Sequence, residues 1–311
     1  MIVILNPRIN IRNNRNREYA ITRTLISIIS YFNYTSTMLI DGRALAKNIY
    51  NSLTKRVARL PFQPVFCDVL VGNDPASIQY VRMKARAAER LGIAFLHAEF
   101  PQSISESDLI EEITRLNTTP HLGGLIVQLP LPASCNRDIV LNAIDGRVDV
   151  DCLTHTNLNL FYSGKSILLP PTPAAVLAVL DSVLSPDATP HCVVIGQGEL
   201  VGRPVTYLLK ARGWDVIEIT TETLCPEQLA SKADVIITAT GRPGLLTKDW
   251  VKEGAIVIDA GTAENAGSIV GDVDSEAVAS VASFLSPTPG GVGPVTIAKL
   301  LENVVLVAEK L

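Results

Sequence analysis

Two residues, Tyr80 and Lys84, stand four positions apart in residues 76–91, where apolar residues recur at helical spacing. Such spacing places both side chains on one helix face, so a phenol and an amine can meet over one bound molecule. An amine in a half-dry cleft can exchange protons near neutral pH, and a neighbouring phenol can orient it or stack on a flat ring. An exposed lysine whose stem covers a buried tyrosine has the same spacing, and spacing alone favours that interpretation.

Polar side chains also follow the apolar strand predicted at 124–128. Gln128 stands at its carboxyl end, where open α/β sheets bind ligands, so its amide could hold a lysine amine or a ligand carbonyl, or simply cap the strand. Asp149 and Asp151 come next, and one such carboxylate can accept two hydrogen bonds from the edge of an amino-pyrimidine ring. A turn with solvated aspartates explains the same residues equally well.

A glycine-rich turn follows the strand predicted at 192–195 and precedes a helical stretch from Arg203. Gly196, Gly198 and Gly202 permit a tight turn and let backbone N–H groups approach a pyrophosphate at a helix N-terminus. A plain strand-to-helix connection is the alternative, but the order of strand, turn, helix and strand favours a dinucleotide site.

The next strand, predicted at 216–219, is followed by Thr220, Thr221 and Glu222. An acidic residue there favours a free ribose hydroxyl, and the glycine turn contains no arginine to attract a 2′-phosphate. The local chemistry therefore favours NAD. Short-chain dehydrogenases also use a Tyr-x-x-x-Lys pair, but there the glycine turn comes first, whereas here Tyr80 and Lys84 precede it.

Strands and helices must alternate along the chain to position these residues. Strands are predicted at 65–71, 94–98, 124–128, 192–195, 216–219, 235–238 and 255–259. Helical stretches separate them, which is typical of α/β folds with a parallel sheet. The clearest helix is 76–91, with Ser77 as its start signal and Gly92 as its stop signal.

Proline and glycine are densest at 168–173 and 286–294, which predicts two hinge strands around an inserted domain. We expect a Rossmann-like NAD(P)-binding domain at 174–288. A first α/β domain, the catalytic one, would combine 38–173 with 289–311, the C-terminal helix returning to it from Val295. A cleft would separate the two domains.

Composition limits the partners. Hydrophobic residues make up 47% of the chain and charged residues 19%, the formal charge is −4, and no long run of one sign occurs, so nucleic acid is an unexpected partner. The five cysteines include no CxxC pair and the four histidines are scattered, so we expect no disulfide framework, no metal and a reducing, cytoplasmic compartment. No apolar run is long enough to predict a membrane span.

Residues 1–37 differ from the rest, with five arginines and one glutamate. A transit peptide would be arginine-rich and acid-poor, but alanine and serine are scarce here. We favour a start of translation at Met38, and we expect this N-terminal extension not to belong to the fold.

Several longer motifs carry a family resemblance. They are Val71 to Ser77 leading into Tyr80 to Lys84, Gly124 to Pro132, Asp149-Val-Asp151, Thr172-Pro173, Val201 to Pro204, Gly271 to Val273 and Pro289 to Pro294. Together they resemble the bifunctional methylenetetrahydrofolate dehydrogenase/cyclohydrolase family from Met38 to Leu311. This resemblance implies NAD(P)-dependent oxidation of 5,10-methylenetetrahydrofolate to 5,10-methenyltetrahydrofolate, and then hydrolysis to 10-formyltetrahydrofolate in the same cleft.

The resemblance also implies roles for single residues. Lys84 would be the central catalytic residue, Tyr80 would pack on the folate and position it, Gln128 would hydrogen-bond Lys84, and Asp151 would bind the pterin ring. Substrate-binding residues would be Ser77, Tyr80, Asp151, Pro289, Gly290 and Gly291. Cofactor-binding residues would be Gly196, Gln197, Gly198, Val201, Gly202, Pro204, Thr221, Thr240, Gly241, Gly261 and Thr262. The implied partners are tetrahydrofolate derivatives and NADP, in a homodimer.

Departures from the family pattern keep alternatives open. Cys152, Asn159 and Pro171 replace a usual Gly, Gly and Cys near the folate, so the chain could be a folate-binding protein or a monofunctional dehydrogenase without the cyclohydrolase step. A dehydrogenase acting on another small substrate is a third hypothesis. Near the cofactor, Gln197-Gly198 replaces the common Arg-Ser, Thr220 a common His and Ala260 a Gly, which leaves NADP against NAD open. Cys152 is best interpreted as a small buried filler.

Overall fold

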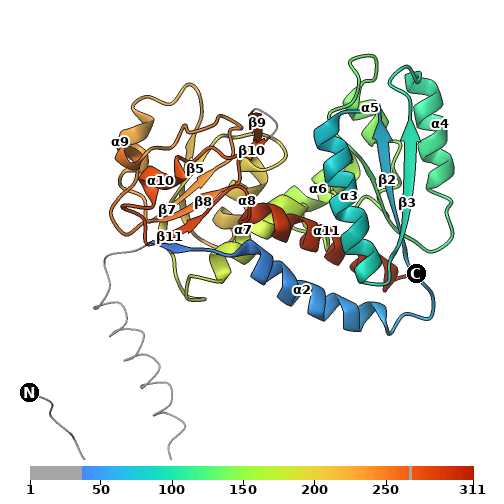
Figure 1. The fold of residues 1–311 in the computed structure, drawn as a ribbon, viewed down its shortest axis with the longest axis horizontal. Coiled ribbons are helices and arrows are strands. Elements are labelled where there is room, and N and C mark those ends of the chain that lie inside the picture. The colour runs from blue at the N-terminus through green and yellow to red at the C-terminus, as the bar shows by residue number, and fades with distance from the viewer. Residues whose placement is uncertain (1–36, 266–267) are drawn as a thin grey trace, which may run out of the picture. The chain divides into compact units, whose positions relative to one another are not determined.

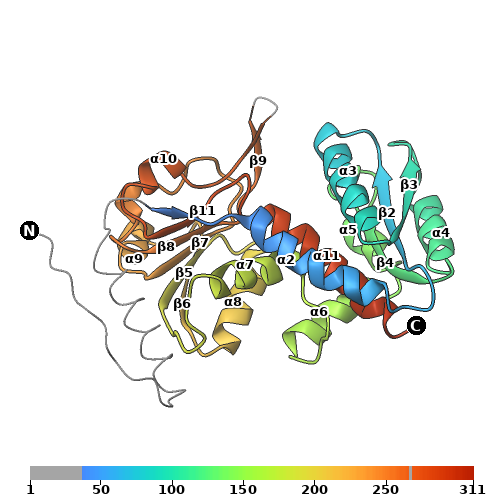
Figure 2. The same ribbon diagram turned by 60° about the horizontal axis from the view of Figure 1, so that its bottom comes forward.

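The computed structural model describes residues 37–265 and 268–311. A three-stranded parallel sheet in order β3-β2-β4 lies in the first half of the molecule; Figure 1 labels β2 and β3, and Figure 2 labels all three strands. Its strands are β2 (Val65–Val71), β3 (Ala94–Phe100) and β4 (Leu122–Val127). β2 lies in the middle and all of β4 is buried, which explains why both sequences are nearly continuous apolar runs.

Four short to medium helices accompany this sheet: α3 (Pro75–Arg90), α4 (Glu106–Leu116), α5 (Arg137–Leu141) and α6 (His155–Tyr162). The start signal of α3 differs from the prediction. Asp74 is the capping residue, since its carboxylate accepts the backbone N–H of Ser77 at 2.8 Å, and Pro75 occupies the first turn, where its missing N–H costs nothing.

A six-stranded parallel sheet in order β1-β11-β8-β7-β5-β6 supports the second half (Figure 2). The strands are β1 (Met38–Leu39), β5 (His191–Ile195), β6 (Asp215–Ile219), β7 (Val235–Thr238), β8 (Ile256–Asp259) and β11 (Phe284–Ser286). Alternate side chains enter separate cores, Cys192 and Val194 on one face, Val193 and Ile195 on the other. A small hairpin joins β9 (Ala263–Asn265) and β10 (Ser268–Val270).

The helices of this half are α7 (Pro171–Asp181), α8 (Gly202–Ala211), α9 (Pro226–Ala230) and α10 (Ser275–Val278), with a 3₁₀ turn at Lys248–Trp250. α7 corrects the prediction of a hinge strand at 168–173. Pro171 and Pro173 lie in its first turn, where neither ring removes an internal hydrogen bond. The prolines therefore mark a helix start and not an extended segment.

Two long helices, α2 (Gly42–Val57) and α11 (Val292–Ala308), run side by side (Figures 1 and 2). α11 serves both cores, because Val292 and Val295 pack in the core of the larger sheet while its later apolar residues pack in that of the smaller sheet. α2 starts where the backbone comes very close to the 290–291 loop. A Cβ on Gly42 would stand 1.8 Å from the Gly291 carbonyl oxygen, so only glycine fits.

Two domain boundaries differ in detail from the prediction. Met38–Leu39, predicted in the first domain, pairs as β1 with β11 in the six-stranded sheet. Thr37, predicted outside the fold, has its hydroxyl oxygen 2.5 Å from the Ala279 carbonyl oxygen, so the fold begins one residue earlier. The other residues of the predicted extension, 1–36, lie outside the described residues. The predicted class, α/β with a parallel Rossmann-like sheet, is confirmed.

Candidate active site

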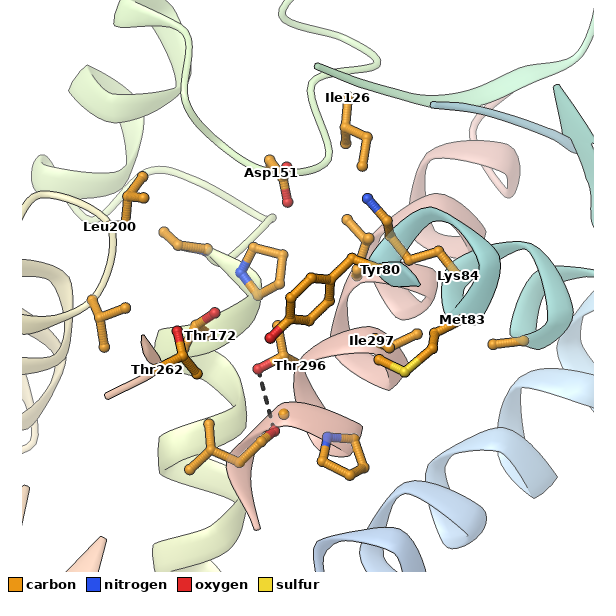
Figure 3. A pocket seen from close by; sticks show the side chains of 18 of the residues that line it. Tyr80, Met83, Lys84, Ile126, Asp151, Thr172, Leu200, Thr262, Thr296 and Ile297 are labelled. Atoms are coloured by element: carbon orange, nitrogen blue, oxygen red, sulfur yellow. Dashed lines mark hydrogen bonds between the residues drawn. The ribbon is translucent and has the colours of Figure 1, made fainter. Parts of the chain in front are cut away.

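A cavity of about 930 Å³ is lined by residues of α11 and of the helices and loops next to the two parallel sheets (Figure 3). The predicted site residues that line it are Tyr80, Lys84, Gln128, Asp151, Val201, Pro204, Thr262, Pro289 and Gly290. The structure thus brings the phenol and the amine of α3 into one space with residues that follow β5 and β8.

Lys84 is almost enclosed, with 5% of its surface exposed. Its Nζ donates a hydrogen bond to Gln128 Oε1 at 2.7 Å, and Gln128 Nε2 donates to the Leu129 carbonyl oxygen at 3.1 Å. The alternative of a solvent-exposed lysine over a buried tyrosine is therefore wrong. The strand end after β4 holds a lysine amine, as the position of Gln128 suggested.

Asp68, on the central strand β2, is a site residue that the sequence reasoning missed. Its side chain is fully buried and its Oδ2 lies 2.8 Å from Lys84 Nζ. Apart from this ion pair, neither carboxylate oxygen accepts a hydrogen bond from the described residues. Burial raises the pKa of Asp68, while the Lys84 charge opposes that rise. The available signal was one acid inside the apolar run VFCDVLV.

Tyr80 lies one helical turn before Lys84 and is half-buried. Burial raises the pKa of its phenol, so the hydroxyl stays protonated at neutral pH. Figure 3 shows its ring standing in the cavity among Asp151, Thr172 and Thr296. A flat ligand can stack on this ring while it contacts the end of the Lys84 side chain.

The two aspartates after β4 separate into different environments. Asp149 is fully buried and its carboxylate accepts the backbone N–H groups of Leu153 and Thr154 at 3.1 and 2.9 Å, so it holds the loop. Asp151 faces the cavity, and burial raises its pKa to about 7, with the Lys84 charge opposing. Cys152 is fully buried at a φ of 59°, and burial raises its thiol pKa, as suits an inert filler.

The sequence analysis also did not predict a cluster of arginines. Arg43 on α2 and Arg86 and Arg90 on α3 line the cavity, and none of these guanidinium groups has a carboxylate within ion-pair distance in the described ranges. Tyr50 lies beside them, and its burial raises its pKa to about 12. This part of the wall can bind carboxylates of a ligand.

The carboxyl ends of the larger sheet form the other part of the site. The chain runs from β5 outward to β6 and returns to β7 on the opposite side, so β5 and β7 flank the switch point where such sheets bind ligands. Gly196 has a φ of 90°, and a Cβ there would lie 2.5 Å from the Ala239 carbonyl oxygen. A Cβ on Gly202 would lie 1.8 Å from the Gly196 carbonyl oxygen. Both positions therefore require glycine.

Within this turn, Gln197 points back into the protein. Its Nε2 donates to Thr206 Oγ1 at 3.2 Å and to the Val194 carbonyl oxygen at 3.3 Å, so the amide ties the turn to β5 and α8. No Cβ clash would occur at Gly198, whose surroundings are open. The turn thus offers backbone, and no cation, to a ligand.

Two buried acids, which the sequence reasoning did not single out, shape the neighbouring loops. Asp272 accepts the backbone N–H groups of Thr240 and Arg242 at 2.6 and 2.8 Å. Asp259 accepts those of Gly261 and Asp272, both at 3.1 Å, and burial raises its pKa to about 6. These carboxylates hold the loops after β7 and β8 at the sheet edge.

Several predicted site residues do not line the cavity. They are Ser77, Gly196, Gln197, Gly198, Gly202, Thr221, Thr240, Gly241, Gly261 and Gly291. Ser77 is buried in the first turn of α3, and a Cβ on Gly291 would collide with Ser286 Oγ at 2.1 Å, so that position requires glycine. Thr221 is exposed just after β6.

Other predicted properties concern metals, membranes and thiols. Within residues 37–265 and 268–311, no group of three His, Cys, Asp or Glu side chains could hold a metal ion. No helix of that part is both long and apolar enough to cross a bilayer. All five cysteines are free, and only Cys225 is exposed.

Comparisons with known proteins agree with this geometry. The family model "Tetrahydrofolate dehydrogenase/cyclohydrolase, catalytic domain" matches residues 40–151, and the NAD(P)-binding domain of the same family matches 170–311. The bifunctional protein FolD of Halalkalibacterium halodurans is 40% identical over 88% of this chain and all of its own length. That of Helicobacter hepaticus is 39% identical over 85% of this chain and 94% of its own length.

Solved structures give the same result. The bifunctional FolD enzyme of Campylobacter jejuni is similar with a TM-score of 0.84 and 37% identity, over 88% of this chain and 99% of that one. The Trypanosoma brucei FolD, solved with NADP and an inhibitor, has a TM-score of 0.84 and 32% identity, over 88% of this chain and 98% of its own. The chain belongs to the tetrahydrofolate dehydrogenase/cyclohydrolase family.

Proposed function

We propose that this chain oxidises 5,10-methylenetetrahydrofolate by hydride transfer to a nicotinamide dinucleotide and then hydrolyses the 5,10-methenyl product to 10-formyltetrahydrofolate. The main support for this function is that Lys84 and Tyr80 line one cavity together with Val201 and Thr262, which follow strands of the six-stranded sheet. A folate and a nicotinamide can meet there. Holding both in reacting geometry accounts for much of such catalysis, since the cofactor supplies the chemistry.

Asp151 is the proposed anchor of the pterin. Its ionised carboxylate can accept two hydrogen bonds from the amino-pyrimidine edge, and this planar contact fixes the orientation of the ring. Because the pKa of Asp151 is about 7, the ligand must favour the ionised form, and binding should strengthen as pH rises through neutrality.

Lys84 is the proposed proton-transfer residue of the second step. Hydride loss leaves the methenyl carbon between two nitrogens that share a positive charge. Water then adds to this carbon and loses one proton; the bond to N5 breaks as N5 takes up a proton, and the remaining hydroxyl proton leaves as the formyl C=O forms. An amine fixed by Gln128 at 2.7 Å can move protons between the water and the nitrogen.

The cationic part of the wall has a proposed role as well. Folates end in a glutamate whose carboxylates must lie away from the reacting ring. Arg43, Arg86 and Arg90 can bind these carboxylates, because their guanidinium groups face the cavity without acidic partners among the described side chains.

We propose NADP as the cofactor, as the family resemblance implies and as the T. brucei relative contains in its structure. NAD is the second candidate, and a specific observation favours it. The exposed residues after β6 are Thr220, Thr221 and Glu222, and Gln197 points away from the turn, so no cation is placed at either position to meet a 2′-phosphate.

Homodimerisation and a cytoplasmic location remain predictions from the resemblance and from cysteine usage. Light scattering of the purified protein measures the first, and a mass near one chain would contradict it. Cell fractionation measures the second. Mass spectrometry of the native N-terminus tests whether translation starts at Met38.

The decisive experiment for the function supplies purified protein with methylenetetrahydrofolate and either NADP⁺ or NAD⁺ in parallel. We expect reduced cofactor and 10-formyltetrahydrofolate to form together, and the ratio of the two rates gives the cofactor preference. Folate binding without turnover with either cofactor would instead support a binding protein, and reduced cofactor without formyl product a monofunctional dehydrogenase. Should Asp151→Ala leave the rate unaffected, a different small substrate would be favoured.

A further inference from the structure

Several carboxylates lie near the Lys84 ammonium. Asp68 Oδ2 is 2.8 Å from its Nζ, and both Asp149 and Asp151 belong to the same charge cluster. The titratable groups of this cluster come from three elements: Asp68 on β2, His97 on β3, and Asp149 and Asp151 on the loop after β4, while Tyr80 lies one turn before the amine on α3. Asp68 is the carboxylate in direct contact.

The Asp68 carboxylate has no other polar partner in the described part of the chain. Asp149 and Asp259 each accept several backbone hydrogen bonds, whereas neither oxygen of Asp68 accepts one within the described part of the chain. A fully buried carboxylate without hydrogen bonds is costly, and a leucine or valine would pack the centre of this sheet without that cost. Its contact with Lys84 is therefore what distinguishes it.

We propose that Asp68 is a positioning residue for the reaction: its carboxylate pairs with the Lys84 ammonium, so that the folate cation forms beside a charge-compensated lysine. This role rests on the proposed function. When the methylene carbon gives up a hydrogen with its two electrons, as hydride, to the nicotinamide, N5 and N10 share the positive charge that remains. An uncompensated ammonium near them would oppose that charge, and Asp68 removes the opposition.

The pair also places the amine for the hydrolytic step. Lys84 Nζ lies 2.7 Å from Gln128 Oε1 and 2.8 Å from Asp68 Oδ2, so loss of the carboxylate removes one of the two contacts that hold the amine. The cyclohydrolase kcat should therefore fall in variants that lack Asp68.

The test compares Asp68→Asn and Asp68→Val with Asp74→Asn. Asp74 lies at the start of the same helix as Lys84 but is exposed, and asparagine caps helices as well as aspartate does, so this control removes one carboxylate without touching the pair. In both Asp68 variants we expect the cyclohydrolase kcat to fall. The dehydrogenase kcat should fall while the KM for the dinucleotide stays unchanged. The control should match the parent.

Other outcomes contradict the role. Folded Asp68 variants that keep the parent's kcat in both reactions would show that Asp68 acts only in packing, while an absence of all turnover in the parent would refute the proposed function itself. Should neither variant fold, a crystal structure of the ligand-free parent decides. The Asp68 carboxylate should lie within ion-pair distance of Lys84 Nζ, and a carboxylate directed away from the amine would overturn the proposal.

Discussion

Replacing Lys84 by methionine should make the stability of the protein strongly dependent on pH, because it leaves Asp68 buried without its counter-ion. At 2.8 Å and an effective dielectric constant near 20, the lost attraction is about 6 kcal/mol before desolvation is counted. The carboxyl can escape this loss by taking up a proton. For an ordinary pKa of about 3.9, protonation at pH 7 costs about 4 kcal/mol, which is the upper limit of the expected destabilisation because the pKa of Asp68 is already raised in the parent.

The sign follows from the raised pKa of Asp68 in the folded protein. A carboxyl that holds its proton more tightly when folded adds no penalty below the unfolded value and an increasing penalty above it. The unfolding free energy of Lys84→Met should thus fall by about 1.4 kcal/mol per pH unit from about pH 4 until the folded-state pKa is reached. The double variant Lys84→Met/Asp68→Val should lack this extra slope.

Urea unfolding followed by circular dichroism at several pH values measures the effect. Trp214 and Trp250 both lie in the half that contains the six-stranded sheet, so their fluorescence reports that half separately and serves as an internal control. If the single and double variants lose stability with the same slope, Asp68 is not held by Lys84 and the reasoning about the buried pair fails.

Three further predictions concern the ligands. In the parent, the KM for the folate should rise as pH falls through about 7, the pKa of Asp151, and Asp151→Asn should raise it about tenfold to a hundredfold and flatten that dependence, as steady-state kinetics will show. Gly202→Ala places a Cβ 1.8 Å from the Gly196 carbonyl oxygen, so the KM for the dinucleotide should rise about tenfold or more. Cyclohydrolase activity on added methenyltetrahydrofolate should persist. An equal loss of dehydrogenase and cyclohydrolase activity would contradict a local effect. Arg86→Ala/Arg90→Ala should raise the folate KM up to about fivefold at low salt, and the difference should shrink as salt is added; an unchanged KM would remove these arginines from the site.

The strands were the most predictable part of the fold. The predicted 65–71 and 235–238 coincide with β2 and β7, because buried parallel strands are short apolar runs with sharp ends. The prolines at 170–173 led to the wrong prediction of a hinge strand, since the same residues that break a helix interior also begin a helix well. Local composition does not distinguish these two uses of proline.

The site was predictable where spacing carries geometry and unpredictable where contacts cross elements. Tyr80 and Lys84 lie one turn apart on any helix, so their common face followed from the sequence. Asp68 meets Lys84 only because α3 packs over the centre of β2, and Asp272 reaches Thr240 only because two loops meet at the sheet edge. Such pairings depend on tertiary packing, which no local pattern specifies.

In the proposed reaction, one cavity holds the pterin and the nicotinamide on either side of the reacting carbon, with Tyr80 and Lys84 facing the folate. A crystal structure of the protein with the dinucleotide and an unreactive folate analogue measures this directly. We expect the pterin stacked on Tyr80 with its amino-pyrimidine edge on Asp151 and the nicotinamide beside Thr262. A folate analogue bound elsewhere, or a nicotinamide directed away from Lys84, would contradict it.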